Sequence, residues 1–242
     1  KMLLDRGFTK LAKERLREAI NIDSKRLATH LYLGKALIRE QAWDEAEKAI
    51  AKAVELKPEA PGAHFAMGQI KIAQKQWDKA AESYAKAAAT LDNGFMWGEL
   101  GKIQIQRKQW PEAEEAYSKA IQKNPKLVGL YSAYARTLAE NGKVGAAIDV
   151  YKQSFNQTKK VSDLAQIGAL YMTAKKFKEA IQVYTEVRKL AAYNPEPDCR
   201  LGLSYQAIGD HANARAGFGF CLKKAQGVKG LEHLVQIATE QL

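Results

Sequence analysis

Four histidines are the side chains in this chain with the widest chemical range, and two of them, His30 and His64, occupy matching sequence contexts. A zinc site needs at least three convergent ligands, and no cysteine or carboxylate shares the face expected for this pair. We therefore predict that both rings replace an aromatic packing residue. His211 falls in a turn position filled by tryptophan elsewhere, so it too is expected to be structural. No metal and no cofactor is predicted.

The two cysteines, Cys199 and Cys221, are the only thiols in the sequence. They are too few and too scattered for a disulfide framework or a zinc cluster. The sequence thus predicts two small thiols, buried or half-buried, as free cysteine commonly is.

Catalytic motifs are absent from the sequence. Gly101 and Lys102 resemble part of a phosphate-binding loop, but Met96 stands where the motif needs its first glycine, and no Ser or Thr follows the lysine. There is no nucleophile elbow and no His-Glu-x-x-His. We predict that the chain is not an enzyme.

Composition favours an ordinary globular protein, with 46% hydrophobic and 27% charged residues over 242 positions. No run of 18 apolar residues and no secretory signal pattern occurs, so we expect a soluble, cytoplasmic chain. The net charge of +11 is compatible with nucleic acid, an anionic membrane or an acidic protein as partner. This charge is spread along the chain, and no block is basic enough to form a nucleic-acid arm.

A periodic pattern dominates the sequence. Four residues after each member of an alanine column comes a large apolar residue, and three further on comes a small or medium one, which is one face of a helix. The alanines recur at intervals of 33 or 34 residues: Ala12, Ala46, Ala80, Ala113, Ala147, Ala180 and Ala214.

A second column precedes the alanines by twelve residues and consists almost entirely of glycine. Because glycine inside a helix costs about 1 kcal/mol relative to alanine, its recurrence indicates that another backbone approaches closely there. Each period therefore predicts a helix A with the glycine and a helix B with the alanine, joined by a turn that carries an aromatic residue. The glycine column is Gly34, Gly68, Gly101, Ala135, Gly168 and Gly202, and the turn residues are Trp43, Trp77, Trp110 and Phe177.

Residues 97–101 and 110–113, followed by Tyr117, Ala120 and Pro125, resemble the tetratricopeptide repeat (TPR) family almost position for position. The resemblance covers essentially the whole chain. It implies an all-α solenoid of antiparallel helical hairpins, stacked into a right-handed superhelix that holds other proteins on its concave side. Three positions depart from the family pattern: Asp198 replaces a large aromatic residue, and Lys71 and Gln104 stand at core positions, where a slight helix rotation would bring in the flanking isoleucines.

The periods predict seven repeats and a cap. The first repeat lacks most of its helix A, so we expect a piece of a longer protein, whose uncovered helix B favours self-association through residues 1–26. The expected segments are a partial repeat at 1–26, repeats at 27–60, 61–93, 94–127, 128–160, 161–194 and 195–227, and a capping helix at 228–242.

The candidate binding surface is a stripe of helix A next to the core stripe. Large apolar residues recur on it in the second to fourth repeats, and cations follow the glycine, which favours an extended or helical peptide bearing acidic groups. The alternative is that neighbouring helices bury these residues. The predicted partner-binding residues are Leu31, Tyr32, Lys35, Ile38, Arg39, Phe65, Gln69, Ile72, Phe95, Lys102, Ile105 and Arg136.

Three functional hypotheses follow, and the first is a protein-interaction scaffold within a larger regulatory or assembly protein. The second is a basic solenoid that binds RNA or an anionic membrane, although Glu99, Glu140 and Glu196 interrupt the cationic groove that nucleic acid would need. The third is a non-catalytic arm of an enzyme encoded upstream. TPR clamps for a carboxyl terminus use asparagines as well as basic residues, and those asparagines are missing from the predicted stripe.

Overall fold

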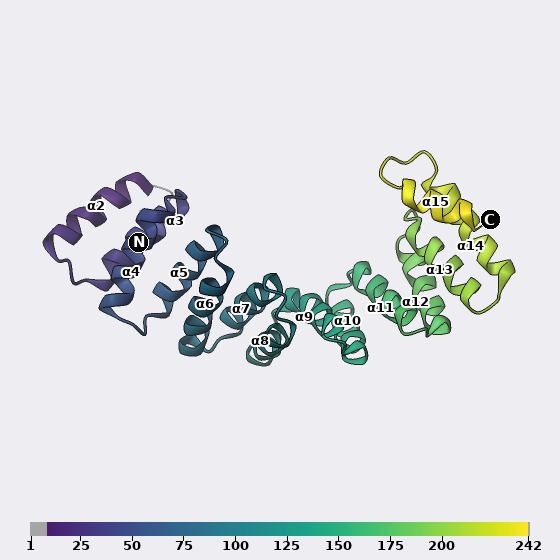
Figure 1. Cartoon of the computed structure of the whole chain (residues 1–242), viewed down its shortest axis with the longest axis horizontal. Coiled ribbons are helices and arrows are strands. Elements are labelled where there is room, and N and C mark those ends of the chain that lie inside the picture. Colours follow the sequence, from purple (N-terminus) through teal and green to yellow (C-terminus); the bar gives the residue numbers. More distant parts are fainter. Residues whose placement is uncertain (1–8, 242) are drawn as a thin grey trace. The chain divides into compact units, whose positions relative to one another are not determined.

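A computed structural model describes residues 9–241, which form helices and turns without any strand (Figure 1). The chain divides into two compact units, residues 1–127 and residues 128–242. The all-α prediction is confirmed for the part that the structure describes. Residues 1–8, which belong to the predicted partial repeat and to its proposed self-association, lie outside the described residues.

The first unit is a row of helices in which each packs against the next along the chain. The pairs α3 with α4, α5 with α6, and α7 with α8 are antiparallel hairpins of one A helix and one B helix each, and α2 packs on α3. Their bounds are α2 (Thr9–Ile22), α3 (Leu27–Arg39), α4 (Trp43–Leu56), α5 (Pro61–Ala73), α6 (Trp77–Leu91), α7 (Gly94–Gln106) and α8 (Trp110–Lys123).

The second unit repeats this arrangement with A helices α9, α11 and α13 and B helices α10, α12 and α14, and α15 packs on α14 and α13. A short 3-10 turn, η1 (Val128–Leu130), precedes α9 and was not predicted. The bounds are α9 (Tyr131–Glu140), α10 (Val144–Thr158), α11 (Val161–Thr173), α12 (Phe177–Leu190), α13 (Glu196–Ala207), α14 (His211–Ala225) and α15 (Glu232–Glu240). None of the described helices combines the length and the hydropathy needed to cross a bilayer.

The two sequence columns meet inside each hairpin. A methyl group added to Gly68 would lie 2.5 Å from the ring of Tyr84, and one added to Gly168 would lie 2.7 Å from the ring of Tyr184. The predicted close approach is confirmed, but what approaches is chiefly a B-helix side chain rather than a backbone. Glycine in helix A thus makes room for the large residue of helix B, and the two helices interlock.

The aromatic residue placed by prediction in each turn is instead the first residue of the B helix, as at Trp43, Trp77, Trp110 and Phe177. The turn itself is shorter, and one residue in it takes a left-handed conformation. Glycine adopts this conformation without a steric penalty, whereas lysine does not. The left-handed residues of these A-to-B turns are Gln41, Lys75, Lys108, Gly142, Lys175 and Gly209, with φ between 56° and 78°.

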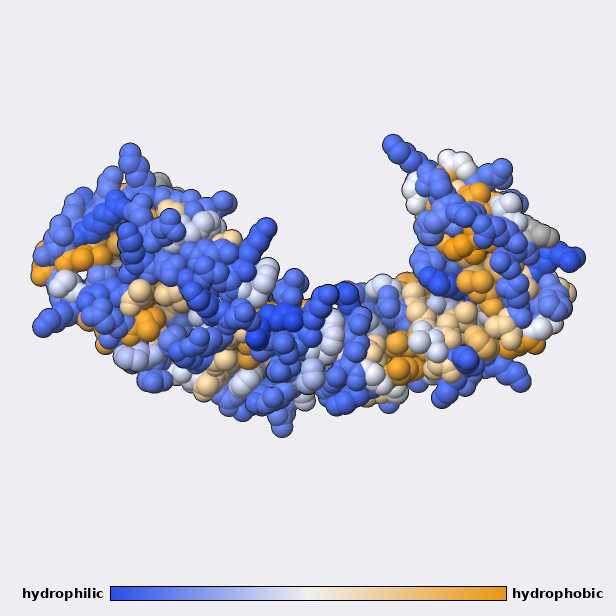
Figure 2. All heavy atoms as spheres, in the orientation of Figure 1, coloured by the Kyte–Doolittle hydropathy of each residue, from blue (hydrophilic) through white to orange (hydrophobic). Residues whose placement is uncertain are grey.

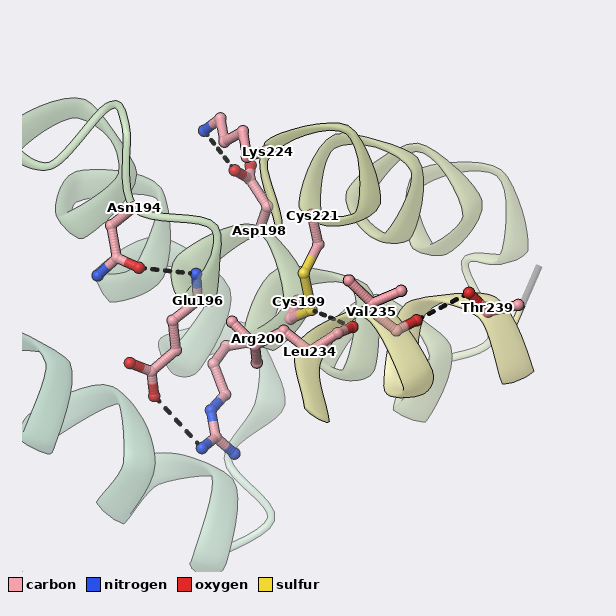
Figure 3. Close-up of a disulfide and its surroundings, with 10 residues drawn as sticks. All are labelled: Asn194, Glu196, Asp198, Cys199, Arg200, Cys221, Lys224, Leu234, Val235 and Thr239. Atoms are coloured by element: carbon pink, nitrogen blue, oxygen red, sulfur yellow. Dashed lines mark hydrogen bonds and ion pairs between the residues drawn. A yellow bond between two sulfur atoms is a disulfide. The ribbon is translucent and has the colours of Figure 1, made fainter. Parts of the chain in front are cut away.

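The prediction of two free thiols is wrong. Cys199 of α13 and Cys221 of α14 form a disulfide, with their Cα atoms 5.2 Å apart (Figure 3). The predicted columns place one cysteine three residues before the glycine of helix A and the other seven after the alanine of helix B, and these positions face each other. The bond is buried beside Phe218 and Leu234, so it joins the last hairpin where α15 packs.

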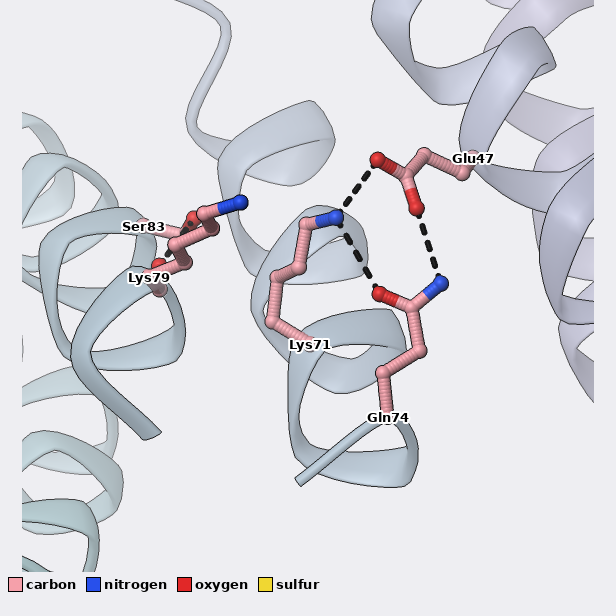
Figure 4. Close-up of polar contacts among 5 residues, drawn as sticks. All are labelled: Glu47, Lys71, Gln74, Lys79 and Ser83. Atoms are coloured by element: carbon pink, nitrogen blue, oxygen red, sulfur yellow. Dashed lines mark hydrogen bonds and ion pairs between the residues drawn. The ribbon is translucent and has the colours of Figure 1, made fainter. Parts of the chain in front are cut away.

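Lys71 and Gln104 keep their buried positions without the helix rotation that was expected. The amine of Lys71 lies 2.5 Å from the carboxylate of Glu47 on α4 and 3.1 Å from the side-chain amide oxygen of Gln74 (Figure 4). Gln104 accepts a hydrogen bond from Arg107, which also pairs with Asp78 on α6. Polar pairs between neighbouring repeats replace the apolar contacts of the family pattern.

Asp198, the third departure, is fully buried and bound by cations from both neighbouring B helices. The amine of Lys224 lies 2.5 Å away and the guanidinium of Arg188 3.7 Å away. An ion triad therefore fills the space that a large aromatic residue would occupy.

Candidate functional site

An open groove with a volume of about 510 Å³ lies between α11, α12 and α13 of the second unit. It is lined mainly by the stripe of helix A just beside the glycine column and by the start of the next A helix. The lining residues are Val161, Ser162, Ala165, Gln166, Ala169, Tyr184, Val187, Ala191, Asn194, Glu196 and Arg200.

The groove has an apolar base and a polar rim. Tyr184 and Val187 are buried, and burial raises the pKa of Tyr184 to about 12, so its hydroxyl group stays protonated at neutral pH. On the rim, Arg200 and Glu196 form a loose ion pair at 3.4 Å. Gln166 is exposed and makes no side-chain hydrogen bond to any described residue.

The equivalent space in the first unit is filled by two phenylalanines. Phe65 stands three residues before its glycine, where Ala165 stands in the groove, and Phe95 occupies the position of Glu196. The ring of Phe65 contacts Tyr84 edge-on at 5.4 Å between centroids, and Phe95 at 6.0 Å. Phe95 remains 51% exposed. One stripe of the repeat is thus an aromatic surface in the first unit and an open groove in the second.

The other apolar residues of the predicted surface are half-buried. Leu31 and Ile38 pack against the core formed by α3, α4 and α5, and Ile72 packs against Tyr84 and its neighbours. Ile105 is half-buried as well. The alternative of burial by neighbouring helices therefore holds in part, since each of these side chains contacts the core on one side and solvent on the other.

The predicted cations differ in their partners. Lys35 lies 5.9 Å from the centroid of the Tyr32 ring and has no carboxylate partner among the described residues. Lys102 pairs with Glu99 at 2.6 Å. Gln69 lies half-buried between the two lysines along the stripe, and Arg39 is exposed at the end of α3.

Arg136 is exposed on α9 and belongs to the second unit, whereas Lys35 and Lys102 belong to the first. The predicted row of three cations therefore stays a prediction.

Two of the four histidines, His30 and His64, act as packing residues, whereas His211, which was expected to be structural, is exposed at the start of α14. His30 and His64, each four residues before a glycine, are buried and donate through Nε2 to the backbone carbonyls of Ser24 and Pro58. Trp97 holds the same position and donates its indole N–H to Asp92 in the preceding loop. Within residues 9–241, no three His, Cys, Asp or Glu side chains converge to hold a metal ion.

Hydrophobic residues gather over α11 to α14 in the view of Figure 2, whereas hydrophilic residues cover most of the first unit in that view. Sequence reasoning missed the groove beneath α11 and α13 because it searched for large apolar residues. Two signals were present: small residues at Ala165 and Ala169, and the late prolines in the segment from Ala191 to Pro197.

Comparison with known proteins agrees with this architecture. A model of the tetratricopeptide repeat family matches residues 3–61, 31–95, 62–128 and 99–155. The matches span more than half of the chain, which therefore belongs to the tetratricopeptide repeat family. Its general role is that of a protein-interaction scaffold. Nothing among the curated proteins matches the sequence.

Solved structures share the fold at low sequence identity. The C-terminal part of a TPR repeat-containing protein from Cytophaga hutchinsonii superposes with a TM-score of 0.77 at 14% identity, over 97% of each chain. MamA gives 0.64 at 19% identity, over 70% of this chain and 93% of its own. YrrB, described as a TPR protein with an unusual peptide-binding site, gives 0.53 at 15% identity, over 93% and 99%.

Proposed function

We propose that the chain holds a partner peptide or protein segment against the A-helix stripe of its first unit, and that it performs no catalysis of its own. The observation that carries this proposal is Phe95, whose ring is half exposed while it rests on Phe65. Exposed aromatic residues with a firm base are typical of the centres of protein interfaces.

Charge on the same A-helix stripe favours a partner with acidic groups. Lys35 has no carboxylate partner, and the pair of Lys102 with Glu99 is at the surface, where such pairs contribute little. An incoming carboxylate would therefore gain attraction at Lys35 without breaking a strong internal contact. YrrB, which shares this fold, is described as binding peptides and supports the same class of partner.

The test is capture of binding proteins from the native source, compared between three variants by quantitative mass spectrometry. For Phe95→Ala and for the double variant Lys35→Glu with Lys102→Glu, the amount of captured partner is expected to fall at least about tenfold. The melting temperature should stay unchanged, because all three side chains reach solvent. Phe220→Ala is the matched control, since Phe220 is 52% exposed in the second unit. Undiminished capture by the first two variants would refute the proposal.

A cytoplasmic location remains a prediction, and one observation counts against it. Disulfides persist mainly in oxidising compartments, and the bond between Cys199 and Cys221 is buried within the last hairpin. A secreted or periplasmic setting would explain the bond directly.

A further inference from the structure

We propose that the groove between α11, α12 and α13 is a second docking site, and that it takes an extended peptide with two aliphatic side chains in alternate positions next to an acidic residue. This inference rests on the proposed function that the repeats hold a peptide. It places a second site in the other unit and defines the sequence pattern of its ligand. Either of these can be wrong while the site in the first unit is right.

The length of the groove sets the length of the ligand. Ser162 and Ala169 line it from the first to the third turn of α11, and seven residues of helix rise about 10 Å. An extended chain rises about 3.3 Å per residue, so three residues span the groove. The volume of about 510 Å³ is within the range of about 300–1,000 Å³ that holds compact ligands.

The spacing of the small residues sets the pattern of side chains. Ala165 and Ala169 are one helical turn apart, about 6 Å along α11. Alternate side chains of an extended peptide are about 6.6 Å apart on the same face. Two aliphatic side chains of a ligand can therefore enter over the two alanines and reach Val187, while the residue between them points away. The spacing of alternate ligand side chains therefore matches the spacing of the two alanines.

The polar rim suits a peptide backbone. Gln166 has an unused amide, and Asn194 uses only its oxygen, which accepts from the backbone N–H of Glu196 at 2.9 Å. Both amides can donate to ligand carbonyl groups. Tyr193, between the lining residues Ala191 and Asn194, is 96% exposed. An aromatic ring this open beside a groove is typical of a surface that a partner covers.

Charge places the acidic residue at one end. Lys160 and Lys189 are exposed and lie close to lining residues in the sequence: Lys160 directly precedes Val161, and Lys189 is two residues from Val187 and from Ala191. Arg200 adds a cation to the rim, but Glu196 already pairs with it. Three of these four exposed side chains are cations, so this rim favours an aspartate or glutamate that follows or precedes the aliphatic pair.

The test uses an array of 12-residue peptides of random sequence, probed with the labelled full chain. Bound peptides are expected to be enriched in aliphatic-x-aliphatic triplets flanked by Asp or Glu. Their affinity should fall at least about tenfold for Ala165→Phe, because this variant carries the residue that fills the equivalent space at Phe65. Ala165→Ser keeps the groove open and is expected to bind like the native chain.

Charge is tested separately with Lys160→Glu combined with Lys189→Glu. The affinity of this variant should fall about fivefold for peptides with the acidic flank and stay unchanged for peptides with glutamine at that position. If Ala165→Phe does not fold, Ala169→Leu replaces it, since Leu203 holds the equivalent position in the next repeat.

Three outcomes overturn the inference: no peptide binds, the bound peptides lack the triplet, or they bind Ala165→Phe as well as the native chain. Peptides that bind Ala165→Phe but are lost on Phe95→Ala would place binding in the first unit only. The proposed function would then survive and the second site would not.

Discussion

A lysine in the core of a helical repeat is tolerated here because a carboxylate of the neighbouring repeat reaches it. The hydrogen bond from Lys71 lowers the pKa of Glu47, and the amide of Gln74 binds the same carboxylate. Most of the Lys71 side chain is shielded from solvent, whereas Glu47 remains one-third exposed. The lysine therefore depends on the pair more than the glutamate does.

Substitutions at this pair should have unequal effects. Glu47→Ala leaves a buried amine without its partner and is expected to cost about 2–3 kcal/mol, below the usual range because the amine can turn toward solvent. Lys71→Met keeps the volume and frees a carboxylate that water can reach, so its cost should stay within about 1 kcal/mol. Urea unfolding at pH 7 measures both.

The pair of Lys71 and Glu47 also makes the stability of the folded chain depend on pH, in a direction that follows from the pKa of Glu47. The pKa of Glu47 is lowered in the folded chain, so its contribution to stability is complete above the unfolded value of about 4.3 and is lost as pH falls through the folded value. The difference in stability between the native chain and Lys71→Met should therefore shrink between pH 5 and pH 3. A difference that is constant over this range would contradict the role assigned to Glu47.

At the level of single residues, sequence reasoning succeeded where a position is defined by the repeat. His30 and His64 were expected to pack and do so, and each ring also reaches back to the segment before its helix, as Trp97 does from the same position. It failed for Cys199 and Cys221, which are 22 residues apart along the chain and meet only after two helices pair. Counting cysteines does not reveal that contact, although laying the two columns side by side would have done so.

The disulfide between Cys199 and Cys221 links the two helices of the hairpin formed by α13 and α14. Closing a loop of this length removes conformational entropy from the unfolded chain worth about 3 kcal/mol. We expect Cys199→Ala combined with Cys221→Ala, or reduction of the native chain, to weaken the protection of α13 and α14 amides against hydrogen exchange by about that amount.

Protection of the first unit is the internal control for this measurement, because repeats contact only their neighbours and effects fade along the array. Loss of protection in α3 to α8 on reduction would show that the bond stabilises more than the last hairpin. Unchanged protection in α13 and α14 would show that the bond adds no constraint there.

Elements were the best predicted level of this structure. Repeated columns of alanine and glycine indicated each helix pair, since burial of both columns is what holds a hairpin together. The short η1 turn and the groove of the second unit were not predicted. The groove depends on the size of residues off the columns, such as Ala165, which the repeat leaves free to vary.

On the scale of the whole molecule, the charge of +11 is the property that the fold does not explain. Many lysines pair with carboxylates of the same or the next helix, as Lys119 does with Glu115 and Lys86 with Glu82. These surface pairs are individually weak, and they break the cationic surface into short stretches.

Binding to nucleic acid should consequently be weak and independent of sequence. We expect dissociation constants of about 10⁻⁴–10⁻⁶ M at physiological salt, with affinity falling steeply between 50 and 200 mM salt as counterions are released. Fluorescence anisotropy with single-stranded RNA and duplex DNA of several sequences provides the measurement. Tight, sequence-dependent binding at physiological salt would favour the basic-solenoid hypothesis over the scaffold.

The phenylalanine pair of the first unit has a consequence for how such arrays diversify. Phe65 is a plug in a space that Ala165 leaves open, and the surrounding ring of Tyr84 or Tyr184 is the same in both places. Two residues, at the positions of Phe65 and Phe95, therefore distinguish a raised aromatic surface from an open groove, and both lie outside the columns that hold the helices together. Substitutions at these positions can change the ligand preference of one repeat at a time, while the buried columns that hold the fold together stay unchanged.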